Sequence, residues 1–307
     1  MNLRKIKDDL AKRAMFCLCL LVLSLAFLMA MGLYLRSRPI LQEKSLLDLL
    51  FASAWHPTQG LFGLGSFIAG TLWVTAIAMI IAVPAGILSA IYLSEYSPKR
   101  IREFAKPVID LLAGISPVIY GAWGLIMVVP LVRDYLMPPL SARFPFWPFA
   151  SDNYTGFSAL TAGIVLGVMC FPIIISVVEE VLATVPFEIR EASLALGATQ
   201  WETIKYAVLK KAQPGIIAAV ILSLSRAFGE TMAVLMVAGC SLHGFPRSIF
   251  DPAYPLPALI ANTYGEMMSI PLYDAAVLAA AFILLLVTMA FNMIGWGVLL
   301  FLERRQS

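Results

Sequence analysis

The sequence predicts an all-α integral membrane protein with six transmembrane helices. Hydrophobic residues make up 60% of the 307 residues, only 13% are charged, and the mean hydropathy is +0.86. A soluble domain could not hide this much apolar surface from water. The chain also contains several apolar runs of about 20 residues or more, the length that a helix needs to cross a bilayer.

Five of these runs contain no charged residue: 14–35, 67–93, 111–132, 153–178 and 275–302. The first exceeds the usual length of a signal-peptide core and ends without a clear cleavage site, so we expect a retained anchor. A sixth run, roughly 215–239, is apolar but carries Arg226 and Glu230. We expect it to span as well, because charges at that depth occur where function or pairing offsets their cost.

The distribution of Lys and Arg predicts the orientation. With six spans, the N-terminus, the 94–107 and 179–212 loops and the C-terminal tail share one side and hold five, four, four and two basic residues. The 36–66, 133–156 and 241–274 loops hold three, two and one. Positive charge accumulates on the cytoplasmic side, so the N-terminus is expected there.

A polar interruption at 186–214 stands out between two apolar runs. Pro186 suits the first turn of a helix and Gly197 suits its end, which predicts a short helix over 186–196. Thr199 and Glu202 have the spacing of a capping box, so a second helix is expected to begin near Gln200 and run toward Pro214. The segment therefore predicts a helical hairpin on the cytoplasmic side.

Charged and apolar side chains alternate on this hairpin, among them Phe187, Glu188, Glu191 and Trp201. Exposed aromatic anchors beside charges are typical of a protein docking surface. The same composition also fits a helix pair that lies on lipid headgroups. The residues alone leave both interpretations open.

The hairpin resembles the cytoplasmic loop of binding-protein-dependent ABC importer permeases, which carries a Glu-Ala-Ala triplet, a later glycine and a later Ile-x-Leu-Pro. The matching residues here are Glu191-Ala192-Ser193, Gly197 and Ala207-Val208-Leu209. Ser193, Ala207 and Lys210 depart from the usual alanine, isoleucine and proline but leave the two helices and the glycine intact. The resemblance implies a type I (MetI-like) importer permease fold whose hairpin docks on a cytoplasmic ATPase. It assigns the coupling surface to Phe187, Glu188, Glu191, Ala192, Gly197 and Trp201.

Four further segments, 62–71, 112–121, 225–234 and 260–266, resemble the PstC-type permease family of high-affinity phosphate importers. Ser116-Pro117 departs from it, since the family more often has proline before serine. The resemblance implies a bacterial inner-membrane subunit that works with an ATPase dimer, a paralogous PstA-type permease and a periplasmic phosphate-binding protein. Another oxyanion, such as sulfate or molybdate, and a second copy of this chain in place of the paralogue stay open. It also implies three segments: 1–66 with the first helix, a permease core at 67–302 and a tail at 303–307.

Arg226 is the residue that points most directly to an anion path. It lies 15 positions after Lys211, about 22 Å along a helix, well inside a bilayer about 30 Å thick. Its planar fork of donors matches phosphate oxygens. Glu230, four residues on, is expected to share its helical face and hold it. We therefore predict that Arg226 and Glu230 line the substrate path.

Ser225 and Thr231 are expected to add hydrogen-bond donors to this path, although such side chains often bond their own backbone instead. An ion pair between Arg226 and Glu230 that only fixes helix packing is the alternative interpretation.

The sequence offers little support for catalysis. It lacks the glycine-rich phosphate loop of an ATPase, so ATP hydrolysis is expected in a separate subunit. Two histidines and four scattered cysteines do not suggest a metal site or another cofactor, and a net charge of +3 does not suggest nucleic acid. A channel or secondary transporter would need no docking hairpin, and an intramembrane enzyme would need a nucleophile or metal group.

Overall fold

The computed structural model describes residues 3–144, 146–151, 153–242, 244–266, 270 and 272–306. Met1, Asn2 and Ser307, in the two expected tails, lie outside this part. The fold is helical apart from one two-stranded hairpin. The longer helices are α1 (Leu3–Glu43), α3 (Gly65–Ile91), α4 (Lys99–Ala113), α8 (Ala159–Ala183), α9 (Phe187–Ala195), α11 (Leu209–Phe228), α13 (Leu256–Thr263) and α14 (Tyr273–Gln306).

Shorter segments connect them: α2 (Leu46–Phe51), α5 (Pro117–Trp123), α6 (Val129–Leu131), α7 (Met137–Arg143), α10 (Gln200–Glu202) and α12 (Met232–Val237). Wider π-helical turns occupy η2 (Tyr92–Tyr96), η3 (Gly124–Val128), η4 (Val132–Leu136) and η5 (Thr203–Val208), and η1 (Pro57–Gln59) is a 3₁₀ turn. The strands β1 (Trp55–His56) and β2 (Leu61–Phe62) pair antiparallel, with Trp55 opposite Phe62 and His56 opposite Leu61.

Six helical stretches in the described part are long and apolar enough to cross a membrane, which confirms the six expected spans. They are Lys7–Glu43, Gly65–Tyr96, Pro117–Arg143, Ala159–Ala183, Gln200–Phe228 and Tyr273–Val298. Their bounds differ from the expected ones, and in the third, fourth and fifth spans the difference has a local cause.

The third expected span, 111–132, is broken near its start. The helix α4 ends at Ala113, and α5 begins at Pro117 after Ser116 adopts an extended conformation (φ −61°, ψ 137°). Proline disfavours a helical conformation at the residue before it and is well suited to open a new helix. The apolar residues at 111–113 therefore close α4, and the span starts after the break.

The fourth expected span starts later than 153. Ser158 caps α8 by accepting a hydrogen bond from the backbone nitrogen of Thr161 at 3.2 Å, and the helix begins at Ala159. Before it, the side-chain oxygen of Asn153 accepts the backbone N–H of Thr155 at 3.1 Å. Such short side-chain bonds favour a turn over a helix, so 153–158 forms a loop.

The expected span at 215–239 is also divided. Its helix starts far earlier, at Gln200, runs through Pro214 and ends at Phe228. A non-helical segment, Gly229 to Thr231, separates it from the short α12. The second arm of the polar hairpin and the charged span are therefore one continuous helical stretch from Gln200 to Phe228.

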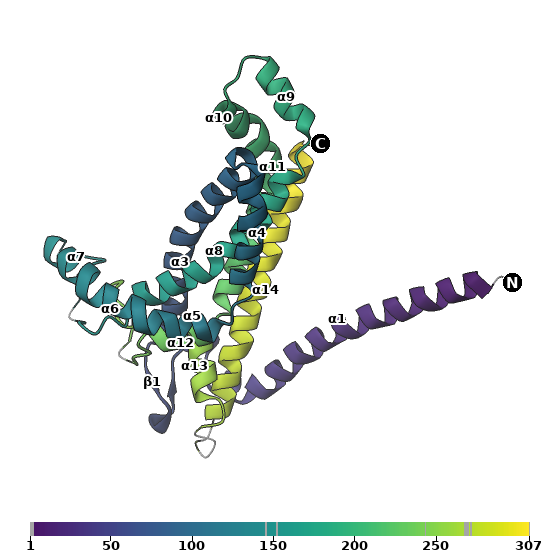
Figure 1. Cartoon of the computed structure of the whole chain (residues 1–307). Coiled ribbons are helices and arrows are strands. Elements are labelled where there is room, and N and C mark those ends of the chain that lie inside the picture. The colour runs from purple at the N-terminus through teal and green to yellow at the C-terminus, as the bar shows by residue number, and fades with distance from the viewer. Residues whose placement is uncertain are drawn as a thin grey trace.

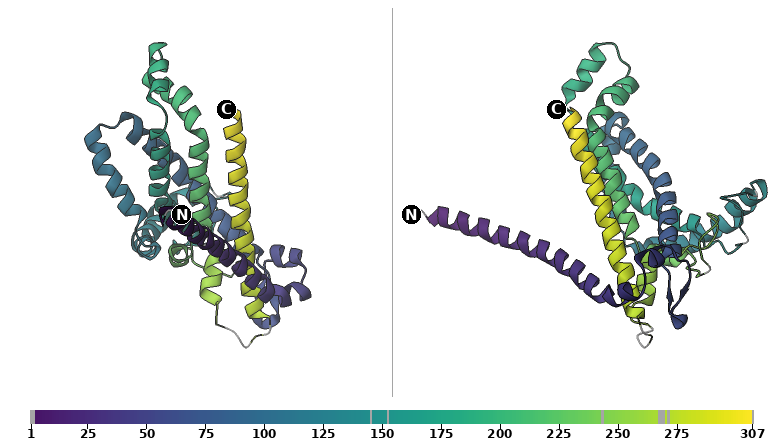
Figure 2. Two further views of the ribbon diagram at one scale, coloured as in Figure 1. Left: turned by 90° about the vertical axis from the view of Figure 1, so that its right-hand side faces the viewer. Right: turned by 180° about the vertical axis from the view of Figure 1, so that it is seen from behind.

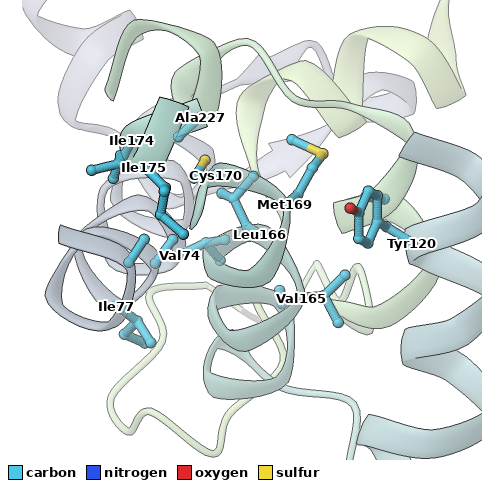
Figure 3. Packing of buried hydrophobic residues seen from close by; sticks show 14 of the residues in the cluster. Val74, Ile77, Tyr120, Val165, Leu166, Met169, Cys170, Ile174, Ile175 and Ala227 are labelled. Carbon is cyan, nitrogen blue, oxygen red and sulfur yellow. The ribbon is translucent and has the colours of Figure 1, made fainter. Parts of the chain in front are cut away.

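The core forms around α8, which packs against α3, α5 and α11 (Figure 1). Figure 3 shows Val74 of α3 and Tyr120 of α5 on opposite sides of Leu166 and Met169 of α8. Small residues allow the close approach of α3 and α8, since a Cβ added at Gly163 would collide with Ile77. This close contact fixes α3 and α8 relative to each other.

The first helix, α1, leaves this bundle at an angle (Figures 1 and 2). The C-terminal part of α1 contacts α14, where the ring centroids of Tyr34 and Phe282 lie 5.8 Å apart. None of the residues in its most apolar window is buried within the chain. The apolar surface of α1 is therefore covered by lipid or by other subunits in a membrane.

The two ends of the bundle differ. The hairpin of α9 and α10 projects beyond one end, and the β-hairpin and α13 close the other (Figure 1). At that opposite end Trp55 makes edge contacts with Phe62 and Phe67, at centroid distances of 5.6 and 5.5 Å. Aromatic side chains therefore pack closely at this end of the bundle, whereas the hairpin at the other end projects from it.

Candidate functional site

The hairpin forms as its local signals predict. The expected helix at 186–196 is α9, and Gly197 follows it in a left-handed conformation (φ +85°) that favours glycine. The capping box is present: Thr199 accepts the backbone N–H of Glu202 at 3.3 Å, and the Glu202 carboxylate accepts the backbone N–H of Thr199 at 2.8 Å. These caps fix where both arms begin and end.

The six predicted coupling residues lie on the exposed surface of this hairpin. None of the residues of α9 is buried, and Phe187 and Trp201 are 65% and 49% exposed. Glu188, Glu191, Ala192 and Gly197 are also exposed. Leu194 and Leu196 add apolar surface beside them. An exposed aromatic and acidic surface at the projecting tip is suited to contact another protein.

Two residues that sequence reasoning missed attach the hairpin to the bundle. Arg190 of α9 donates from Nη2 and Nε to the carboxylate of Glu95 in η2, at 2.7 and 3.1 Å. Both side chains are largely buried, with exposed fractions of 17% and 8%. The available signal was a lone arginine in the short acidic segment 187–191, although nothing local points to its partner 95 residues away.

A second buried carboxylate was also missed. Glu179, near the end of α8, is 2% exposed and accepts hydrogen bonds from Arg102 Nε at 2.8 Å and from Lys106 Nζ at 3.1 Å. Both cations belong to α4, where their spacing of four residues places them on one face. The pair Glu179-Glu180 at the end of an apolar run was the sequence signal for this cluster. It ties α4 to α8.

Arg226 and Glu230 lie on either side of the break after α11. Arg226 is in the last turn of α11 and is exposed in the isolated chain. Glu230 Oε1 accepts the backbone N–H groups of Thr231, Met232 and Ala233, at 3.1 to 3.3 Å, and so caps α12. The expectation that Arg226 and Glu230 share one helical face is wrong, because the helix ends at Phe228 between them.

The side chain of Arg226 has no hydrogen-bond or ion-pair partner among the described residues. It lies within electrostatic range of Tyr120 on α5 and of Cys170 on α8. Figure 3 shows its neighbour Ala227 beside Cys170 and Ile174 of α8. The guanidinium is therefore free to meet a group from outside the described chain, near the junction of three helices.

The smaller predicted donors are engaged elsewhere in this conformation. Ser225 donates to Asn292 Oδ1 of α14 at 2.9 Å, and Thr231 donates to the carbonyl of Gly229 at 3.3 Å. The buried hydroxyl of Ser223, one turn before Arg226, has no partner in the described part. The structure thus places Arg226 and Glu230 on either side of the break after α11 and gives Ser225 and Thr231 other partners.

In the described residues, no three His, Cys, Asp or Glu side chains gather as metal ligands do. The partly buried Cys240 lies outside the spans, and burial raises the pKa of its thiol to about 11. It therefore stays protonated near neutral pH.

The chain is also similar to known transport proteins. The model of the family described as "Binding-protein-dependent transport system inner membrane component" matches residues 82–306. The chain is 38% identical over 261 residues to the phosphate transport system permease protein PstC of Xylella fastidiosa, covering 84% of this chain and 80% of that protein. It is 34% identical over 279 residues to the probable PstC of Methanocaldococcus jannaschii, covering 89% and 88%.

The fold resembles a solved bacterial ABC transporter involved in the import of the acidic polysaccharide alginate. The TM-score is 0.54 at 16% identity, and the match covers 96% of this chain and 98% of that chain. This likeness shows the type I (MetI-like) importer permease fold that the hairpin motif implied. With a family match over most of the chain and relatives above 30% identity, the chain belongs to the binding-protein-dependent transport system inner membrane component family.

Proposed function

We propose that this chain is a transmembrane permease subunit of an ATP-driven phosphate importer, forming half of the translocation path. The observation that carries the proposal is Arg226, an arginine in a spanning helix with no side-chain partner among the described residues. An isolated cation in a bilayer costs about 2.5–3.5 kcal/mol even on the lower scales. A water-filled path with a passing oxyanion offsets that cost.

The position of Glu230 supports a path over a packing pair. Its carboxylate accepts three backbone N–H groups of its own chain and does not pair with Arg226. Arginine presents a planar fork that binds two phosphate oxygens at once. The names of the relatives from Xylella fastidiosa and Methanocaldococcus jannaschii support phosphate as the oxyanion.

The partners follow from the family and from the hairpin. We infer a cytoplasmic ATPase dimer that hydrolyses ATP and binds the exposed face of α9, with the N-terminus on the same side. A paralogous PstA-type permease supplies the second half of the path, and a periplasmic phosphate-binding protein delivers the ion at the opposite end. ATP binding then closes the ATPase dimer and moves the hairpins of the two permease subunits. The path around Arg226 changes the side of the membrane to which it opens, in an alternating-access cycle.

The substrate is tested by uptake into liposomes that contain the reconstituted importer with its binding protein. Labelled phosphate should accumulate only with ATP inside, and excess unlabelled phosphate should suppress the signal. Sulfate and molybdate at the same excess should leave the uptake signal unchanged. At neutral pH phosphate still carries a proton that it can donate in a hydrogen-bonded site, whereas sulfate and molybdate do not. If labelled phosphate does not accumulate but labelled sulfate or molybdate does, the permease belongs to another oxyanion.

The separate ATPase is tested by Glu191→Lys. Glu191 is exposed and has no side-chain partner among the described residues, so the change leaves the fold of the permease intact while reversing a charge on the coupling surface. We expect the ATPase to copurify about tenfold less, which corresponds to a loss of about 1.4 kcal/mol of binding free energy. Glu43→Lys, at an exposed glutamate at the end of α1 and away from the hairpin, is the matched control. Uptake that continues after the ATPase has been lost indicates a secondary transporter.

A further inference from the structure

Both arms of the hairpin form hydrogen bonds with the same residue of the bundle, Glu95. Arg190 of α9 binds the carboxylate of Glu95, and Gln200, the first residue of α10, donates to the backbone carbonyl of Glu95 at 3.0 Å. Glu95 lies in η2, which continues α3. A displacement of either arm therefore acts directly on the end of α3.

The same arginine also holds the end of α8. Its Nη1 donates to the carbonyl of Val185 at 2.6 Å, and its Nη2 donates to the carbonyl of Leu182 at 3.0 Å. A cation at this position adds hydrogen bonds to carbonyls at the end of the helix and complements the negative end of the helix dipole. Arg190 thus joins three elements: α9 by its own backbone, α3 through Glu95 and α8 through two carbonyls.

The attachment of α9 combines an apolar contact with polar ones, since Ile189 packs against the buried core cluster. The helix α9 contributes no buried residue. The two arms of the hairpin are joined by the hydroxyls of Ser193 and Thr203, which lie 2.9 Å apart. Beside the contact lies an open cavity of about 540 Å³ lined by Glu95, Arg190, Gln200, Phe187 and Leu194 among others. The hairpin has space to move there, and the directional hydrogen bonds of Arg190 constrain how it moves.

We propose that Arg190 and Glu95 form the coupling joint, the contact through which a load on the exposed face of α9 is passed to α3 and α8. The inference rests on the proposed function, because it assumes that an ATPase moves the hairpin. A bidentate guanidinium–carboxylate pair transmits both translation and rotation, since two parallel bonds fix the orientation of the two groups. Arg190 is thus a positioning residue, whereas Glu191 and Phe187 belong to the docking surface itself.

The test uses the complete importer in liposomes and measures two rates per assembled complex: phosphate uptake and ATP hydrolysis. In Arg190→Gln and in Glu95→Gln we expect the ATPase to copurify and hydrolyse ATP as before, while phosphate moved per ATP falls about tenfold, the range of typical coupling between sites. The double variant should lose no more than Arg190→Gln alone, because Arg190→Gln already removes the contact with Glu95 together with the bonds to Leu182 and Val185. Lys205→Gln, an exposed cation on the same hairpin, should keep the ratio of the unchanged protein.

An unchanged ratio in Glu95→Gln overturns the proposal. So do additive losses in the double variant, which would mean that the two residues act separately. If Arg190→Gln loses the ATPase, the decision rests on Glu95→Gln, which leaves every hairpin side chain in place. Failure of the proposed function is seen separately, as an unchanged importer that takes up no phosphate at all.

Discussion

The charged residues of this permease serve two regions in opposite ways. At the hairpin end, Glu95 and Glu179 each bind cations from other helices. Glu95 binds Arg190 of α9, and Glu179 binds Arg102 and Lys106 of α4. At the break after α11, Glu230 binds the backbone of its own short helix and leaves Arg226 without a side-chain partner in the described part. Carboxylates hold helices together in the first region, whereas a cation stays available in the second.

In the first region charged groups hold helices in place, whereas in the second a charged group is available to bind an ion. A buried pair is strongly coupled to its geometry, because loss of one partner leaves an uncompensated charge. An unpaired guanidinium in a water-filled path can bind and release an ion, provided that no carboxylate of the chain neutralises it permanently.

The largest effect is expected at Arg226. Arg226→Gln removes the charge and one face of the donor fork, so phosphate uptake should fall roughly 30- to 150-fold, the equivalent of about 2–3 kcal/mol for hydrogen bonds to a charged group. Arg226→Lys should fall less, since it keeps the charge but not the fork. Uptake by the reconstituted importer, normalised to assembled complex, gives the measurement. A Gln variant that assembles and transports normally removes Arg226 from the path.

A smaller and different effect is expected at Glu179. Glu179→Gln leaves Arg102 and Lys106 without their carboxylate, but both side chains are more than a third exposed and can be hydrated. We expect a loss of about 1–3 kcal/mol in the free energy of unfolding in detergent, with uptake per assembled complex unchanged. The exposed Glu180, 3.8 Å from Lys106, is the control, and its Gln variant should lose about 0–1 kcal/mol. Lost uptake with full stability would place Glu179 in the transport path.

Local signals explain what the sequence could predict. Long apolar runs predicted six spans, and Gly197 with the Thr199–Glu202 capping box predicted the hairpin, because each depends on residues within a few positions of one another. Arg226 was found for the same reason, as a charge within an apolar run. The coupling surface was predicted from its resemblance to a known loop and stays a prediction.

Long-range pairing and helix breaks explain what it could not predict. Glu95 and Arg190 are 95 positions apart, and Glu179 and Arg102 are 77 apart, so only the folded bundle brings them together. The break at Gly229 was missed because 215–239 is apolar throughout apart from its two charges, and composition does not show where a helix ends. That break is what separates Glu230 from Arg226.

The smallest effect is expected at Glu230, and it tests the comparison most closely. If its carboxylate only caps α12, Glu230→Gln keeps an accepting oxygen and should lose about 0.5 kcal/mol of stability, from the lost charge at the helix N-terminus. Glu230→Ala removes the cap and should lose about 1 kcal/mol. Uptake should follow the same order and fall far less than in Arg226→Gln. Thermal unfolding and uptake of the same preparations give both values. If Glu230→Gln is as stable as the unchanged protein but abolishes uptake, its charge acts on Arg226 or on the ion, and the two charged regions do not differ as described.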